Sequence, residues 1–207
     1  MKFIINLFYL KNKFRTDKII LVSLFILGEL FMKKIDFEQI YKIMDESFPD
    51  KEKRTYSDQL ALLEDKRCKV FVERNKENEI ITFLLVWIFN DFCFIEYLAT
   101  DKRYRNLGLG SRLLNSCIKE FPTPIIIEVE PPENDINKRR IEFYTRLGFH
   151  LNNYKHKQPS LQKHTEPCEL LIMSYPSPIV KKEFLQFRNK IFNTIYKIKP
   201  SSIGLEE

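Results

Sequence analysis

The stretch that decides the fold of this 207-residue chain is Arg105-Asn106-Leu107-Gly108-Leu109-Gly110. It follows a strand-like run over residues 92–100 and opens a helical pattern over residues 108–120. A glycine-bearing turn from a strand into a helix points unpaired backbone N–H groups at one spot, where the positive end of the helix also lies. Gly108 and Gly110 leave room for a phosphate to approach that backbone closely. The stretch therefore predicts an anion-binding turn.

Two familiar nucleotide motifs do not fit this turn. A dinucleotide fingerprint needs a third glycine where Leu113 stands, and a P-loop needs a Lys-Ser/Thr pair where Ser111 and Arg112 stand. Glycine turns before helices are common, so the stretch alone leaves an ordinary turn open.

A second pattern lies downstream of a strand-like run over residues 124–130. Asn137 is followed seven residues later by Tyr144, and Gly148-Phe149 comes next. Seven residues are about two helical turns, so Asn137 and Tyr144 share one helix face. Gly148 stands where the end of a helix favours a left-handed residue. The Arg-x-x-Gly-x-Gly turn and this helix, in this order, resemble the two cofactor-binding motifs of the GNAT N-acetyltransferases, which bind acetyl-CoA.

The resemblance implies a mixed α/β (α+β) fold with a central, mostly antiparallel sheet flanked by helices. The periodicity of residues 36–175 agrees with that order of elements. The expected helices lie near 37–47, 57–65, 108–120 and 135–147, and the expected strands near 69–74, 79–89, 91–100, 124–130, 149–154 and 168–174. Two features depart from the family pattern. Residues 30–36 leave little room for its first strand, and residues 178–198 form an extra apolar helical stripe, which typically packs on its own domain.

We divide the chain into an N-terminal extension (1–31), an acetyltransferase domain (32–176) and a C-terminal helical extension (177–207). The extension's apolar run, residues 19–27, is too short to span a bilayer as a helix, which needs roughly 20 residues. Three alternatives stay open for this segment: a tail preceding a functional start at Met32, an added packing helix, or contact with a membrane surface.

Composition excludes several classes of function. The net charge is +6, but residues 1–34 contribute five of those charges, so a nucleic-acid partner is not expected. The four cysteines contain no C-x-x-C pair, which favours reduced thiols in a cytoplasmic protein. The three histidines lack metal-ligand spacing, and no motif of a covalent nucleophile is present. We therefore expect no metal.

The resemblance implies a position for acetyl-CoA between the strand that ends at Thr100 and the strand 124–130, which in this family run parallel and splay apart. Backbone groups of Leu98, Ala99 and Thr100 would pair with the pantetheine arm like an added strand. Asn137 is similar to the family's asparagine that contacts the cofactor arm, although a position near a helix start also suits capping. The pyrophosphate would be held by the backbone of Asn106, Leu107, Gly108, Leu109, Gly110 and Ser111, with the Arg105 side chain nearby.

The implied reaction is direct attack of a neutral amine on the thioester in a ternary complex. A backbone N–H near Leu98 would stabilise the oxyanion. Tyr144 matches the family's proton donor to the leaving thiolate, and reference pKa values make full transfer uphill by about 2 kcal/mol. Glu96 is the first candidate base, because it is a lone carboxylate in an apolar strand. Glu130 is the second, and Glu128 shares its face; an outward-facing position stays open for all three.

We therefore expect an acetyl-CoA-dependent N-acetyltransferase that acts on a primary amine of a small molecule or peptide. The alternatives are a non-catalytic module on the same fold that binds acyl-CoA or a partner, and a membrane-associated protein. Basic residues in segment 154–168 would disfavour a polycationic acceptor, although a solvated loop is the favoured explanation for them. The acceptor, the acyl chain length and a homodimer are left open.

Overall fold

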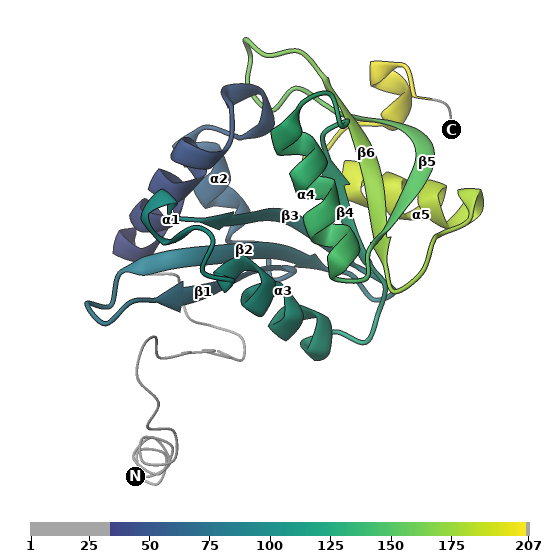
Figure 1. Ribbon diagram of the computed structural model, residues 1–207. Coiled ribbons are helices and arrows are strands. Elements are labelled where there is room, and N and C mark those ends of the chain that lie inside the picture. The colour runs from purple at the N-terminus through teal and green to yellow at the C-terminus, as the bar shows by residue number, and fades with distance from the viewer. Residues whose placement is uncertain (1–33, 206–207) are drawn as a thin grey trace, which may run out of the picture.

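The centre of the molecule is a six-stranded sheet, seen in a computed structural model that describes residues 34–205 (Figure 1). The strands are β1 (Cys68–Arg74), β2 (Ile80–Ile88), β3 (Cys93–Thr100), β4 (Ile125–Val129), β5 (His150–Gln158) and β6 (Cys168–Tyr175). Their spatial order is β1-β2-β3-β4-β6-β5. The β3–β4 pair is parallel and the other neighbours are antiparallel. The mixed, mostly antiparallel sheet that the sequence predicts is confirmed.

Helices cover both faces of this sheet. They are α1 (Lys34–Ser47), α2 (Tyr56–Leu62), α3 (Leu109–Glu120), α4 (Asp135–Arg146) and α5 (Lys181–Ile191), with short turns η2 (Asp50–Glu52), η3 (Lys102–Tyr104), η4 (Phe192–Tyr196) and η5 (Pro200–Ile203). Buried side chains of α1 and α5 pack on one face, and those of α3 and α4 pack on the other. None of the helices within residues 34–205 is long and apolar enough to cross a membrane.

Strand β2 shows how the sequence builds this two-sided core. Its nine residues, Ile80–Ile88, form an almost continuous apolar run, which is typical of a strand buried on both faces. Successive side chains point to opposite faces. Phe83 and Trp87 therefore join the cluster under α1 and α5, while Leu84 and Val86 join the cluster under α3 and α4.

Strands β3 and β4 separate part-way along their length. Residues 93–95 pair with residues 125–127, and the pairing ends there. A bulge on β3 lies at the same level, because Ile95 and Tyr97 pair with consecutive residues of β2, which leaves Glu96 as the extra residue. The β3 backbone beyond Ile95 is thus not bonded to β4, and the sheet opens at this point.

Two glycines in the left-handed conformation lie at the start of α3 and just after the end of α4. Gly108 caps the start of α3 with φ +73°, and Gly148 follows α4 with φ +88°. Such φ values are accessible to glycine at little cost. The predicted glycine turn and the predicted end of the second helix are both confirmed.

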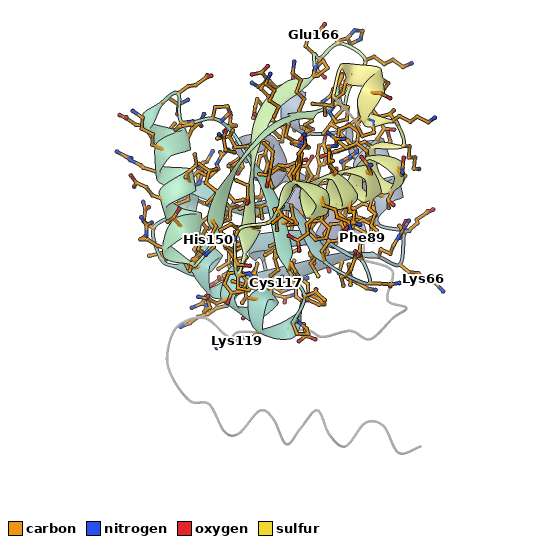
Figure 2. All side chains as sticks on the ribbon, turned by 90° about the vertical axis from the view of Figure 1, so that its right-hand side faces the viewer. Lys66, Phe89, Cys117, Lys119, His150 and Glu166 are labelled. Atoms are coloured by element: carbon orange, nitrogen blue, oxygen red, sulfur yellow. The ribbon has the colours of Figure 1, made fainter. Side chains whose placement is uncertain are left out.

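The C-terminal helix packs on the molecule's own sheet. Figure 2 shows α5 facing the viewer with Phe89 close to it. Phe187 lies 4.5 Å from Phe92, measured between ring centroids, and Phe92 stacks on Phe89 at the same distance. The packing interpretation of this helical stripe is therefore confirmed.

Three further predictions concern the extent of β5, the cysteines and the N-terminal residues. Strand β5 extends to Gln158, four residues beyond the expected end, because part of the segment read as a loop pairs with β6. The four cysteines are free and buried, as expected. The extension 1–31 lies outside the described residues, and residues 34–36, where little room for the family's first strand was expected, already belong to α1.

Candidate active site

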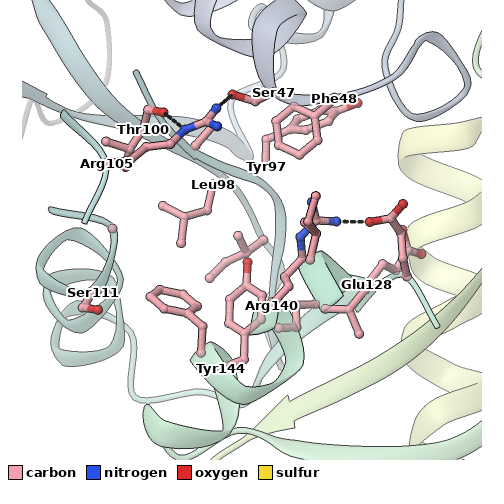
Figure 3. A pocket seen from close by; sticks show the side chains of 18 of the residues that line it. Ser47, Phe48, Tyr97, Leu98, Thr100, Arg105, Ser111, Glu128, Arg140 and Tyr144 are labelled. Atoms are coloured by element: carbon pink, nitrogen blue, oxygen red, sulfur yellow. Dashed lines mark hydrogen bonds and ion pairs between the residues drawn. The ribbon is translucent and has the colours of Figure 1, made fainter. Parts of the chain in front are cut away.

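A cavity of about 660 Å³ opens where β3 and β4 separate (Figure 3). Its walls come from the end of β3, the glycine turn, the end of β4, α4 and the η2 turn between α1 and α2. The predicted cofactor-binding residues that line it are Leu98, Ala99, Thr100, Arg105, Asn106, Gly108, Leu109, Gly110, Ser111 and Tyr144. The glycine turn and the α4 motif that contains Tyr144, which are far apart in the sequence, therefore line the same cavity.

The glycine turn forms one end of the cavity. A Cβ atom built on Gly108 would meet no protein atom within 4 Å, so space is open above this backbone. The turn also holds Asn106 at φ +64° and leads directly into the first N–H groups of α3, a 12-residue helix. Free N–H groups and the positive end of a helix dipole favour an anion. This end of the cavity therefore fits a phosphate group.

Beside the glycine turn, the side chain of Arg105 links the end of β3 to the end of α1 (Figure 3). Its Nε donates to the backbone oxygen of Thr100 at 3.2 Å, and its Nη2 donates to Ser47 Oγ at 3.2 Å. The guanidinium remains exposed and adds a positive charge at the mouth of the cavity.

Leu107 and Asn137 are not among the residues that line the cavity in the described part of the chain. Leu107 is exposed. Asn137 is buried and donates from its side-chain amide to the Pro131 backbone oxygen at 3.0 Å, while its own backbone N–H is capped by Asn134 at 2.9 Å. Asn137 therefore supports the loop before α4. Its contact with the cofactor stays a prediction.

Tyr144 points its hydroxyl group into the cavity (Figure 3). Its ring packs edge-on against Phe143 and Phe149 and is buried, but no hydrogen bond from residues 34–205 occupies its hydroxyl. Burial raises the pKa of Tyr144 to about 12, although nearby Arg140 lowers it slightly. The phenol is therefore protonated at neutral pH and free to donate a hydrogen bond.

Four carboxylates line the other end of the cavity: Glu52, Glu96, Glu128 and Glu130. The Glu96 carboxylate is 5% exposed, so it does not face outward. Its Oε1 lies 2.5 Å from Arg54 Nη1, and its Oε2 accepts from Trp87 Nε1 at 2.7 Å. Both oxygens of the first candidate base are thus already occupied.

Glu128 also points inward, so the outward-facing alternative is wrong for it. Its Oε1 lies 2.6 Å from His156 Nε2, and its Oε2 accepts from the Tyr196 hydroxyl at 2.8 Å. His156 is fully buried on β5. The interpretation of segment 154–168 as a wholly solvated basic loop is therefore also wrong. Carboxylates are the main charged groups at this end of the cavity.

Glu52 and Glu130 lie close to one another. Glu52 was not predicted from the sequence. Glu130 forms an ion pair with Arg140 of α4. Glu52 is buried on η2, and its Oε1 has no hydrogen-bond partner within residues 34–205. Burial and the neighbouring Glu130 raise the pKa of Glu52 to about 7. Nothing in the local sequence marks Glu52, because its burial depends on packing against distant strands.

Comparisons with known proteins agree with this geometry. The model of the acetyltransferase (GNAT) family matches residues 37–149, which contain the glycine turn, Tyr144 and the split strands. The chain belongs to the GNAT family. This GNAT N-acetyltransferase is 28% identical over 163 residues to YjbC of Bacillus subtilis (strain 168), which is assigned as an acetyltransferase; the match covers 77% of this chain and 82% of YjbC.

Solved structures show the same architecture. A protein from Bacteroides thetaiotaomicron assigned to the GNAT family has a TM-score of 0.69 and 28% identity, over 79% of this chain and 93% of that chain. An aminoglycoside 6'-N-acetyltransferase in complex with coenzyme A has a TM-score of 0.55 and 13% identity, over 75% and 99% of the two chains. At that identity the second likeness concerns the fold alone.

The site of this GNAT enzyme thus has two chemically different ends. One end offers backbone N–H groups to a phosphate, and the other gathers carboxylates suited to a protonated amine, with Tyr144 facing the same space. No group of histidine, cysteine and acidic side chains that could hold a metal ion occurs among the residues described.

Proposed function

We propose that this protein transfers an acetyl group from acetyl-CoA directly to a primary amine of a small molecule or peptide within a ternary complex. One observation carries the proposal: a single cavity joins an anion-binding helix start to a cluster of carboxylates. Such a cavity can hold both reactants at once, which removes the need for a covalent enzyme intermediate.

The residues present fit acetyl-CoA. The backbone from Asn106 to Ser111 would hold the pyrophosphate, and the open space above Gly108 would admit it. The β3 backbone from Leu98 to Thr100, which β4 leaves unpaired, would bind the pantetheine arm as an added strand. Acetyl-CoA supplies the thioester whose acetyl group is transferred. A structure with this fold was solved in complex with coenzyme A, which supports the choice of ligand.

Tyr144 is the proposed donor to the leaving sulfur. A pKa of about 12 places full proton transfer to a thiolate of ordinary pKa uphill by about 5 kcal/mol. A hydrogen bond to sulfur is therefore its main contribution, and transfer completes only as the thiolate is desolvated. A backbone N–H near Leu98 would hold the developing oxyanion.

The carboxylate end would receive the amine. Glu96 is a poor proton acceptor there, because Arg54 and Trp87 already occupy its oxygens. Glu130 faces the same end and remains a candidate contact for the acceptor. The four buried free thiols suit a reducing, cytoplasmic compartment.

The first test is calorimetric titration of the full chain with CoA and acetyl-CoA, comparing Gly108→Ala with Gly204→Ala. Both glycines have φ above +70° and open space around a new Cβ, but only Gly108 lines the cavity. Each substitution costs about 1–2 kcal/mol in backbone strain. We expect Gly108→Ala to weaken CoA binding at least about tenfold, whereas Gly204→Ala retains wild-type affinity.

A screen of amines with thiol release as the readout completes this test. Equal affinities of the two glycine variants would contradict the placement of the pyrophosphate. Tight CoA binding without thiol release for any amine would favour a non-catalytic acyl-CoA-binding module.

A further inference from the structure

Among the four carboxylates at this end of the cavity, Glu52 is distinguished by a buried oxygen that has no hydrogen-bond partner within residues 34–205. Arg54 neutralises Glu96, Arg140 neutralises Glu130, and Glu128 accepts from His156 and Tyr196. Oε1 of Glu52 has no hydrogen-bond partner in the described chain although it is buried. A buried carboxylate oxygen without a hydrogen-bond partner is costly, and such groups gather at functional sites.

The η2 turn holds Glu52 in place from several sides. The Tyr97 hydroxyl of β3 donates to the Glu52 backbone oxygen at 2.8 Å. Gln162 Nε2 donates to the backbone oxygens of Asp50 at 3.2 Å and Lys53 at 3.0 Å. Lys53 in turn pairs with Asp50 at 2.8 Å. A group fixed in this way is preorganised for proton transfer.

The charges around Glu52 favour its protonated form. Burial, the charge of Glu130 and a hydrogen bond with it raise the pKa of Glu52 to about 7. The positive charges of Arg140 and Lys51 lower this pKa by smaller amounts. The titratable groups that face it are Glu130 after β4, Arg140 on α4, Lys51 on η2, Tyr97 on β3 and Cys168 on β6. The nearby charge of Glu130 therefore favours a proton on Glu52 near neutral pH.

We propose that Glu52 is the group that receives the proton of the acceptor's ammonium, with Glu130 as its positioning partner. This inference rests on the proposed function. The acceptor then enters as a cation whose ammonium meets a carboxylate with a buried oxygen that has no hydrogen-bond partner within residues 34–205.

One N–H proton of the ammonium passes to a Glu52 oxygen, directly or through one water molecule. The freed nitrogen lone pair forms the C–N bond to the thioester carbonyl carbon, and the C–S bond breaks with its electron pair on sulfur. The sulfur accepts a hydrogen bond and then a proton through Tyr144, which regains its proton from solvent, while Glu52 releases its own. A second N–H proton of the nitrogen leaves as the amide forms.

The test is the pH profile of kcat/KM for the full-length protein with acetyl-CoA and an active amine. We expect an acidic limb with an apparent pKa near 7 in the wild type. Glu52→Gln should lower kcat by about 10²- to 10⁴-fold and abolish that limb, while CoA affinity is unchanged. Glu52→Asp should retain the limb at a reduced kcat.

Two further variants make the test specific. Glu130→Gln removes the like charge and should move the limb to lower pH by about one unit. Glu64→Gln removes an exposed carboxylate just after α2 that does not line the cavity, so the wild-type profile is expected. Folding of each variant is checked by urea unfolding.

The outcomes separate this inference from the proposed function. A limb that persists in Glu52→Gln, with kcat near the wild-type value, overturns the role of Glu52 and leaves acetyl transfer standing. Absence of both CoA binding and thiol release in the wild-type protein overturns the proposed function, and this inference falls with it.

Discussion

Tyr144 combines a buried ring with a hydroxyl that residues 34–205 leave without a hydrogen-bond partner. The ring packs against Phe143 and Phe149, so it would keep its place without the oxygen. The hydroxyl faces the cavity that also contains the glycine turn. The ring therefore contributes to packing and the hydroxyl group faces the site. Removing the hydroxyl oxygen alone distinguishes the two contributions.

Tyr144→Phe is expected to lower kcat by about 10²-fold, because the leaving sulfur loses its hydrogen bond. The free energy of unfolding and the CoA dissociation constant should be nearly unchanged, since the ring contacts remain. Thiol release, urea unfolding and calorimetry with CoA measure the three quantities. An equal loss of turnover and CoA affinity would mean that Tyr144 has a structural role.

Residue roles were predictable from the sequence where they depend on local signals. Gly108 and Gly148 were found because a left-handed residue at a helix end is a local requirement. Tyr144 was found through its spacing from those motifs. Glu52 carries no such signal, since its neighbour Glu130 lies 78 residues away in the chain. The partners of Glu96 were hidden for the same reason.

The elements were predicted more fully than the contacts between them. Alternation and helical periodicity located the strands and helices of the sheet, and the parallel pair followed from the resemblance. The end of β5 was missed, because its polar sequence from Asn152 to Gln158 lacks an apolar alternation. His156 lies there, buried against Glu128 on β4 and aromatic rings of the C-terminal segment.

The C-terminal helix α5 and turn η4 are part of the folded core and also reach the cavity. Phe187 and Ile191 belong to the same buried cluster as Trp87 of the sheet. Tyr196 of η4 donates to Glu128, which lines the cavity. This segment lies beyond residues 37–149, which match the family model, yet it supplies a hydrogen bond to the site.

Phe187→Ala is expected to lower the free energy of unfolding by roughly 3–5 kcal/mol, because it leaves a void against Phe92. Gln186→Ala on the exposed face of the same helix is the matched control and should change stability by less than about 0.5 kcal/mol. Urea unfolding followed by tryptophan fluorescence measures both. Similar small losses for the two variants would show that α5 is dispensable for the core.

At the scale of the whole molecule, the carboxylate end of the cavity carries an electrostatic cost, because Glu52 is buried close to Glu130. Glu52 has a raised pKa, and Glu130 contributes to that shift. The folded state therefore binds a proton that the unfolded chain, with an ordinary pKa of 4.5 for Glu52, has released by neutral pH. The stability that this proton provides is complete below about pH 4.5 and is lost as the pH rises through 7. Such a cost is expected where a base is tuned for function.

Glu52→Gln should therefore stabilise the protein at alkaline pH. Its free energy of unfolding, relative to the wild type, should rise by about 2–3 kcal/mol between pH 5 and pH 8, because glutamine has no charge to bury. Urea unfolding of both proteins across this range measures the difference, and Glu64→Gln, an exposed position just after α2, should follow the wild-type curve. This measurement needs no substrate. Parallel curves for Glu52→Gln and the wild type would mean that Glu52 ionises normally in the folded protein, and the proton acceptor would then have to lie elsewhere in the cavity.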